Sequence, residues 1–351
     1  FDRCYLHAPG LNRVRRGFAL NASEVTVSNS YVAGFAGAQD ETQAIACWNG
    51  PGPLHILNNY LEAGAEDILI GGNDPSIQNM IPSDIEIKGN YLTKVLSWRG
   101  QATIKTVLEL KNARRVTVMG NVIERGLDCS AMTITVRNQN GGAPWSTLED
   151  VEVRSNVFRS AGSGINILGQ DDVHPSQELK RVRIANNLFD DISHERWGSN
   201  GYFVQLSGGR EIRVEHNTVF HSASMIKVYG GRPVSGFVFR DNILSYNQYG
   251  VWGEGASGSV AVIEKYFPGG VFTNNVIVNG QEIDANEIQL PSRNFLVPSF
   301  KAVGFINQQA GDYRLATNSR YKGKGIDRTD IGCDFDALRK EVGSQAASPS
   351  G

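Results

Sequence analysis

Apolar and polar residues alternate in short runs along most of this chain, and one such run recurs. Each copy reads apolar, any residue, apolar, two residues, Asn, and then two residues that are mostly apolar. The stretch Val151-Glu-Val153-Arg-Ser-Asn156-Val-Phe is one example. Because alternation with a period of two is typical of strands, each copy predicts two short strands joined by a turn at the Asn.

The Asn of this motif marks the period of the repeat. It occupies eight positions, separated by 31, 31, 35, 31, 30, 25 and 33 residues: Asn59, Asn90, Asn121, Asn156, Asn187, Asn217, Asn242 and Asn275. Upstream, Val25 to Val32 fits the motif with Ser30 in the Asn slot, and Cys4-Tyr5-Leu6 fits the second half of an earlier copy. The chain therefore begins partway through a copy, and we interpret it as a fragment or processed form.

A third strand lies between successive copies. The alternating triplets that predict it are Leu108–Leu110, Ile134–Val136, Ile165–Ile167, Val204–Leu206 and Ile226–Val228. Three short strands per period indicate an all-β solenoid, a right-handed parallel β-helix of about ten coils. The Asn side chains are then expected to stack as a hydrogen-bonded ladder. A barrel of alternating strands and helices would need eight amphipathic helices, which the intervals do not contain.

The repeat predicts one domain with three parts. Residues 1–294 form the β-helix, residues 295–342 form a C-terminal capping segment with a helix near Asp334–Lys340, and residues 343–351 form a disordered tail. The 39 Gly and 28 Asn of the 351 residues fit the many turns of such a fold.

Net charge, apolar run length and cysteine spacing exclude several classes of binding site and of protein. With 34 basic and 36 acidic residues the formal net charge is −2, and nucleic-acid binders usually carry a basic excess. No uncharged apolar stretch is long enough to span a membrane. The cysteines Cys4, Cys47, Cys129 and Cys333 lie far apart without a CxxC pair. We expect buried single thiols rather than zinc ligands, with a Cys4–Cys47 disulfide as the alternative.

Several further motifs carry a family resemblance. They are Trp48–Pro53, Asn58–Glu62, Gly71–Pro75, Glu109–Asn112, Arg137–Gln139, Gly311–Leu315 and Asp330–Gly332. With these motifs the chain resembles the pectin-lyase-like superfamily, and within it most closely a group of secreted bacterial β-helix proteins of mostly unassigned function. The superfamily includes polysaccharide lyases, glycoside hydrolases, epimerases, tailspikes and adhesins. The resemblance implies a polysaccharide partner and a secreted, cell-surface or periplasmic location.

Outward side chains of the third strand predict a polymer-binding surface. The middle residue of each triplet points outward, which gives a row of Glu109, Thr135, Asn166, Gln205 and Lys227. Two positions further along, Lys111, Arg137 and Tyr229 form a second row. Lys111 and Arg137 are 26 residues apart, about one coil, and should be neighbours.

A Lys beside an Arg suits β-elimination on a uronic acid. The base removes the proton at C5, and the cationic neighbour both favours a neutral Lys and pairs with the carboxylate. The arrangement is similar to the Lys and Arg pair of the chondroitinase B and alginate lyase family. In that family acidic and Asn side chains hold calcium, which implies Glu109 and Asn138 as Ca²⁺ ligands here, although the acidic cluster is less complete. The competing interpretation is a solvated salt bridge between coils.

Paired carboxylates support hydrolysis as a second hypothesis. Asp171 and Asp172 follow the strand of Asn166, with His174 close by, and Glu109 or Asp74 is a partner from another coil. The alternative is that this segment is only a solvated turn.

Tryptophans in Gly- or Pro-rich loops are candidates for stacking on sugars. Those proposed to contact substrate are Trp98, Trp145 and Trp197, and packing over a strand is the alternative. A third hypothesis, from another class, is a non-catalytic adhesive or filament-forming β-helix that self-associates through its sheet ends.

Overall fold

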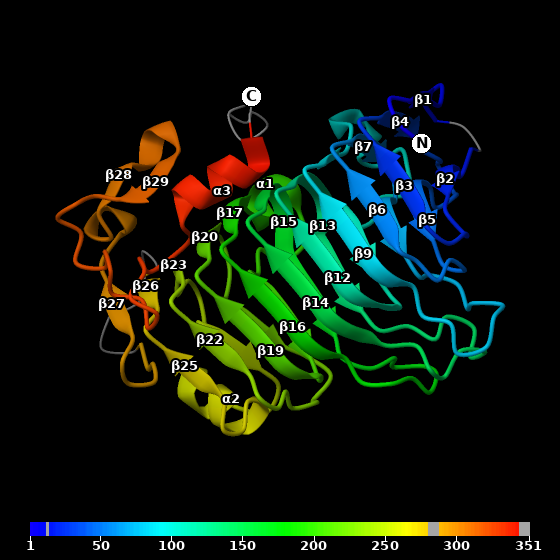
Figure 1. Cartoon of the computed structure of the whole chain (residues 1–351). Coiled ribbons are helices and arrows are strands. Elements are labelled where there is room, and N and C mark those ends of the chain that lie inside the picture. The colour runs from blue at the N-terminus through cyan, green and yellow to red at the C-terminus, as the bar shows by residue number, and fades with distance from the viewer. Residues whose placement is uncertain (12–13, 280–287, 344–351) are drawn as a thin grey trace.

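The computed structural model describes residues 1–11, 14–279 and 288–343, and their strands run mainly parallel (Figure 1). A nine-stranded parallel sheet, here called face A, lies toward the viewer in Figure 1. Its strands are β3 (Val25–Ser28), β6 (Leu54–Leu57), β9 (Ser83–Lys88), β12 (Ala113–Met119), β14 (Leu148–Arg154), β16 (Lys180–Ala185), β19 (Arg210–Glu215), β22 (Val238–Arg240) and β25 (Val271–Thr273).

The other parallel strands belong to an 18-stranded sheet that forms two faces. The long strands β13 (Val122–Thr135) and β15 (Val157–Leu168) run through both faces. Face B also contains β1 (Tyr5–His7), β4 (Tyr31–Phe35), β7 (Tyr60–Ala63), β10 (Tyr91–Thr93), β17 (Leu188–Ile192), β20 (Thr218–His221), β23 (Ile243–Ser245), β26 (Val276–Val278) and β27 (Phe295–Val297). Face C also contains β2 (Arg16–Ala19), β5 (Gln43–Cys47), β8 (Glu66–Ile70), β11 (Leu108–Leu110), β18 (Val204–Ser207), β21 (Ile226–Val228) and β24 (Val251–Gly253).

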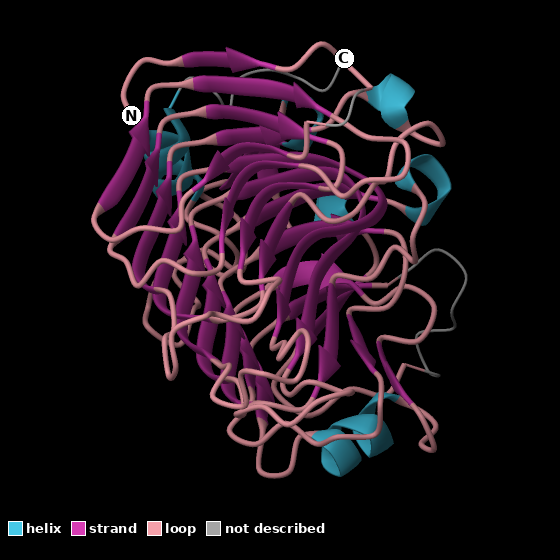
Figure 2. Cartoon of the chain, turned by 90° about the vertical axis from the view of Figure 1, so that its right-hand side faces the viewer, coloured by secondary structure: helices cyan, strands magenta, loops and turns pink. Residues whose placement is uncertain are grey.

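The chain therefore winds repeatedly through faces A, B and C, which is consistent with a parallel β-helix (Figure 2). The inward residues of all three faces form one continuous core. On face A, for example, Ile85 and Ile87 are buried while Glu86 between them is half-buried. The predicted all-β architecture with parallel strands is confirmed.

The predicted Asn ladder is also confirmed, at the corner between faces A and B. The backbone N–H of each ladder residue donates to the side-chain carbonyl of the Asn one coil later, at 2.9 to 3.1 Å. The last partner is Asn294, a ladder residue that the repeat motif did not predict. Asn59, Asn90, Asn121 and the ladder residues up to Asn275 are buried, so these bonds replace the water that a buried amide would otherwise need.

The residue before each ladder position has a left-handed backbone. Gly89 and Gly120 occupy it with φ of +66°, a conformation that costs glycine nothing. The other described residues at this position with positive φ are Asn29, Asn58, Ser155, Asn186, His216, Asp241, Asn274 and Arg293. Asn and Asp tolerate this region better than most residues, which accounts for part of the Gly and Asn excess.

The C-terminal segment packs along the side of the solenoid. Helix α3 (Phe335–Val342) confirms the predicted helix, and its N-cap Asp334 accepts a hydrogen bond from Ala337 N at 3.0 Å. The helix covers outward residues of face B through Phe335, Leu338 and Val342. The antiparallel pair β28 (Phe305–Asn307) and β29 (Asp312–Leu315) and the short helices η2 (Phe300–Ala302) and η3 (Gln308–Ala310) precede it. Closure of the solenoid end by this segment stays a prediction.

Three further elements interrupt the coils. Two are short, η1 (Leu96–Trp98) and α1 (His194–Trp197). The third, α2 (Ser259–Tyr266), buries Val262, Ile263 and Tyr266. Burying these side chains stabilises a helix that the coil repeat does not encode.

All four cysteines are free thiols, so the alternative of a Cys4–Cys47 disulfide is not realised. None of the helices in the described ranges has the length and apolar character of a membrane crossing. The predicted tail lies outside the described residues beyond Gly343.

Candidate functional site

The outward row of face C differs from the predicted row by one member. Glu109 pairs with Thr133, Thr133 with Asn166, Asn166 with Gln205, and Gln205 with Lys227. Thr133 therefore takes the place assigned to Thr135, which pairs with Leu168 and is buried. The slip arises because Met132, not Ile134, pairs with Leu108. A slip of two residues keeps the same face, so the rest of the row lies as predicted.

Lys111 and Arg137 are neighbours across one coil step. The backbone N–H of Arg137 donates to the carbonyl of Lys111 at 3.0 Å. Each side chain is held in an ion pair of its own, as the competing interpretation of salt-bridged outward charges also expects. Lys111 Nζ lies 3.4 Å from Glu109 Oε2, and Arg137 pairs with Asp171 and Asp172.

Lys111 belongs to a charged group that we call the Glu66 cluster: Glu41, Gln43, Glu66, Lys105, Glu109 and Lys111. Gln43 Nε2 donates to Glu66 Oε2 at 2.7 Å. Lys105 Nζ lies 2.6 Å from Glu41 Oε1 and 3.7 Å from Glu66 Oε1. The sequence missed Glu41 and Glu66 as site residues. In β8 the outward residue that pairs with Glu109 is Leu69. Glu66 lies three residues earlier and pairs with Gln43, so the alternation of the third strand did not mark it.

Glu66 carries an unusual carboxyl group. Its side chain is 0% exposed, and it also makes a side-chain hydrogen bond with Glu109. Burial, followed by the negative charge of Glu109, raises the pKa of Glu66 to about 7. Both causes favour the neutral, protonated form of Glu66.

The Arg137 side chain faces one fixed and one accessible carboxylate. Asp171 is 2% exposed and accepts from the backbone N–H of Asn138, Val173 and His174 at 2.7 to 3.3 Å. Burial pushes the pKa of Asp171 upward, but these N–H donors and the charge of Arg137 outweigh it and hold the pKa below its usual range. Asp172, by contrast, is 56% exposed, so an incoming anion can replace it.

The surroundings of Asp171 and Asp74 do not favour the hydrolase hypothesis. A carboxyl with a lowered pKa is a poor general acid, which argues against Asp171 in that role. Asp74 accepts from Asn140 N and Gly142 N and so fastens a loop.

Asn138 is 0% exposed, and its side-chain oxygen accepts from Ala143 N at 2.7 Å. Asn138 and Glu109 therefore do not fit a calcium ion. Among the described residues no group of three or more His, Cys, Asp or Glu is placed to hold a metal.

The remaining polar residues line the same face. Thr133 Oγ1 and Asn166 Oδ1 are buried and have no hydrogen-bond partner within the described part of the chain. The hydroxyl of Tyr229 donates to the carbonyl of Ile167 at 3.2 Å and lies in electrostatic range of Arg137 and Asp172. Gln205 Nε2 donates to Ser130 Oγ at 3.4 Å, and Lys227 lies over the ring of Trp252.

The predicted tryptophans are mostly engaged in packing. Trp98 is buried and leaves no ring face for a sugar. Trp145 Nε1 donates to Met80 O at 3.0 Å, and Trp197 Nε1 donates to Asp191 Oδ2 at 2.9 Å. Only one indole lies on the outward row of face C among the described residues, Trp252. His174 lies against Gly141 of the neighbouring loop.

Comparison of the chain with protein-family models, with curated proteins and with solved structures found no match. The case for a function therefore depends on the geometry of face C.

Proposed function

We propose that this protein cleaves a uronate-containing polysaccharide by β-elimination. The observation that carries the proposal is the position of Lys111 and Arg137 on neighbouring coils, joined by the 3.0 Å backbone hydrogen bond, with the displaceable Asp172 on Arg137. The proposal includes a secreted or cell-surface location and a fold of the pectin-lyase-like superfamily with about ten coils.

Each step has a group to perform it. A uronate carboxylate takes the place of Asp172 on the Arg137 guanidinium, a bidentate partner for carboxylates. Lys111 removes the C5 proton, the C4–O4 bond breaks, and a C4=C5 double bond forms. The leaving O4 takes a proton, for which the neutral Tyr229 hydroxyl is the proposed donor. Burial raises the pKa of Tyr229 to about 12, so it is protonated at neutral pH.

The Glu66 cluster borders the proposed base. Glu109 Oε2 lies 3.4 Å from Lys111 Nζ, and this ion pair must open before the Lys111 amine can take the C5 proton.

The test is the ultraviolet absorbance of the unsaturated product on alginate, pectate and glycosaminoglycans. Lys111→Ala and Arg137→Ala are expected to lower kcat/KM by roughly 10²–10⁴-fold, the usual contribution of a general base or a charge-stabilising group. Arg181→Ala is the matched control, since Arg181 pairs with Asp150 on face A, away from the proposed site. Asp172→Asn should lower KM, because the competing carboxylate is gone.

Other outcomes would favour the other functions. Full activity in Lys111→Ala would remove Lys111 as the base. New reducing ends without the absorbance would indicate hydrolysis, for which the raised pKa of Glu66 is the favourable observation and its complete burial the unfavourable one. No turnover on the panel, together with ordered polymers of the protein, would indicate a structural β-helix.

A further inference from the structure

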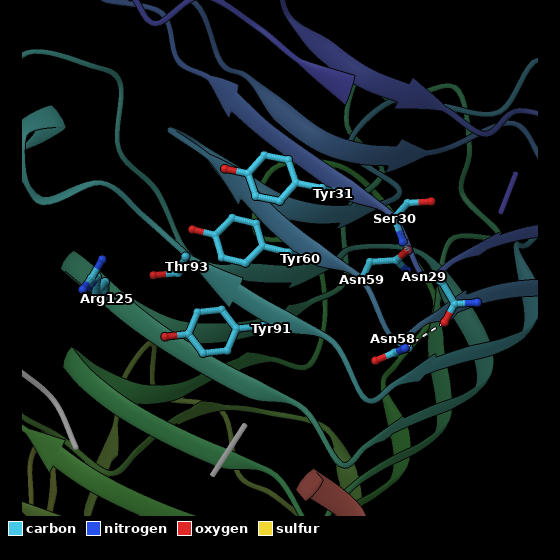
Figure 3. Close-up of a pocket in the computed structure, with 9 residues that line it drawn as sticks. All are labelled: Asn29, Ser30, Tyr31, Asn58, Asn59, Tyr60, Tyr91, Thr93 and Arg125. Carbon is cyan, nitrogen blue, oxygen red and sulfur yellow. Dashed lines mark hydrogen bonds between the residues drawn. The ribbon is translucent and has the colours of Figure 1, made fainter. Parts of the chain in front are cut away.

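A row of tyrosines follows the outward surface of face B, away from the site on face C. Tyr5, Tyr31, Tyr60 and Tyr91 are paired in register from strand to strand. Successive ring planes differ by only 6° to 8°, and the ring centroids lie 5.1, 4.7 and 5.6 Å apart. Parallel rings at these separations are offset rather than eclipsed, so each ring leaves part of its face uncovered. Figure 3 shows Tyr31, Tyr60 and Tyr91 side by side with their hydroxyls pointing the same way.

The same row is covered further along the solenoid by the chain itself. Tyr91 pairs with Val122, Val122 with Val157, and Val157 with Leu188. Helix α3 packs on these three aliphatic residues. Tyr91 is half-buried and still packs against this cluster. The row therefore changes there from aliphatic to aromatic, and Tyr5 at its far end is exposed. A cavity of about 700 Å³ lies in front of Tyr31, Tyr60 and Tyr91.

Hydrogen-bonding groups border the rings at their hydroxyl end. Tyr60 donates to Glu62 Oε2 at 3.0 Å, and Tyr91 donates to Glu124 Oε1 at 2.7 Å. Thr93 Oγ1 donates to the same oxygen of Glu124 at 3.1 Å. Arg125 lines the cavity at this end as well. These contacts fix the rings in one orientation before any ligand arrives, which lowers the cost of binding.

Amide groups border the opposite end of the rings. Asn58 Nδ2 donates to Asn29 Oδ1 at 2.7 Å, and Asn29 Nδ2 donates to Asp2 Oδ1 at 2.8 Å (Figure 3). The surface thus has an aromatic centre one ring wide, with polar groups on both sides. Its repeat is the coil spacing of the solenoid.

We propose that the tyrosine row binds a neutral polysaccharide chain lying along the solenoid axis. A pyranose ring is apolar on its faces and carries hydroxyls around its edge, so it matches an aromatic centre with polar borders. Asp2, which is paired with Arg3, and Glu62 stand at the two borders, and Arg125 lines the cavity as well. The cavity thus lacks the excess of positive charge that a uronate chain would require. The row is a second carbohydrate site, independent of the proposed cleavage on face C.

Binding is tested by titration calorimetry of the whole chain with soluble β-glucan, xyloglucan and galactomannan. We expect one of these to bind, and Tyr31→Ala or Tyr60→Ala to weaken it about tenfold, equivalent to about 1.4 kcal/mol. Tyr31→Phe keeps the ring and should lose less. The control is Tyr249→Ala, an exposed tyrosine outside the row.

The outcomes separate this proposal from the others. Circular dichroism that matches the wild type shows that a weakened variant is folded. Turnover of a uronate polymer, if found, should be unchanged in the tyrosine variants, so failure of one proposal leaves the other intact. No binding across the panel, or equal binding by Tyr31→Ala and Tyr60→Ala, overturns the proposal. If the protein forms a dimer that Tyr31→Ala abolishes and that glycan does not disrupt, the proposal is also overturned, because the tyrosine row then binds a second copy of the chain.

Discussion

Two buried ionisable side chains, Lys94 and Glu66, differ in how well their charges are compensated. Lys94 Nζ donates to the carbonyls of Ala63, Gly64 and Ala65 at 2.8 to 3.0 Å and lies 3.8 Å from Asp67 Oδ1. Its charge is thus balanced by oxygen atoms on several sides. Glu66 has one strong donor, Gln43, and an oxygen without a hydrogen-bond partner in the described residues.

This difference makes the protein's stability depend on pH through Glu66. Its pKa of about 7 in the folded chain exceeds the ordinary value of 4.5, so the folded state binds more protons than the unfolded state between those values. The stabilising contribution is fully present below pH 4.5 and is lost as the pH rises through 7. We expect the Glu66-dependent part of the unfolding free energy to fall by on the order of 2–3 kcal/mol across this window.

Urea unfolding at pH 5 and pH 8 measures the effect. Glu66→Gln cannot ionise and should show a smaller loss of stability between the two pH values than the wild type. Glu178→Gln, at an exposed carboxylate paired with Arg210, is the control. An equal loss in Glu66→Gln and the wild type would contradict the assignment.

At the scale of the element, the Asn ladder is the part of the structure on which the coils depend most directly. Asn156 Nδ2 donates to Val118 O, Arg154 O and Asn187 Oδ1, and its Oδ1 accepts from the backbone and the amide of Asn121. Replacing it leaves buried donors and acceptors unpaired on both adjacent coils.

Asn156→Ala is expected to destabilise the protein by about 2–5 kcal/mol, because each unsatisfied buried group costs about 1–3 kcal/mol. Denaturant unfolding gives the value, with the exposed Asn200→Ala as the comparison. A cost below about 1 kcal/mol would mean that water satisfies the ladder positions instead.

The ladder also shows how far the sequence could predict the structure. A motif with a strict internal spacing fixes strand, turn and inward face together, so the ladder residues and parallel sheets followed from it. The third strand has no such marker, and Thr133 and Thr135 could be exchanged because both positions satisfy the alternation.

The site needed information that the chain pattern does not contain. Glu66 meets Glu109 through side chains on adjacent coils separated by 43 residues, an interval unlike the 31-residue period. Trp145 and Trp197 were expected to face a ligand because they lie in loops, but each indole N–H finds an acceptor inside the protein. Loop conformation decides such contacts, and no periodicity describes it.

At the scale of the whole molecule, the C-terminal segment connects coils that are distant in sequence. Besides α3, its Val303, Leu315, Tyr321 and Ile331 pack against the outward residues of β23, β26 and β27. Leu338 is fully buried between α3 and face B.

Leu338→Ala should therefore cost about 2–5 kcal/mol, the usual range for a buried leucine, and should loosen α3 before the coils. Hydrogen exchange distinguishes loosening of α3 from unfolding of the coils. Amides of α3 are expected to lose protection, while those of β13 and β15 keep it. Lys340→Ala, on the solvent side of the same helix, provides the comparison. Equal loss throughout would show that helix and coils unfold as one unit.

The ladder has a consequence for how such a protein can change over time. Intervals between its asparagines vary from 25 to 35 residues, yet the rungs stay within 2.9 to 3.1 Å. The extra residues leave and re-enter the coil at the same height, as the loop fastened by Asn138 does. Insertions and deletions in these loops can therefore accumulate without disturbing the hydrogen-bonded ladder, so the surface formed by the loops is free to diverge while the scaffold is kept.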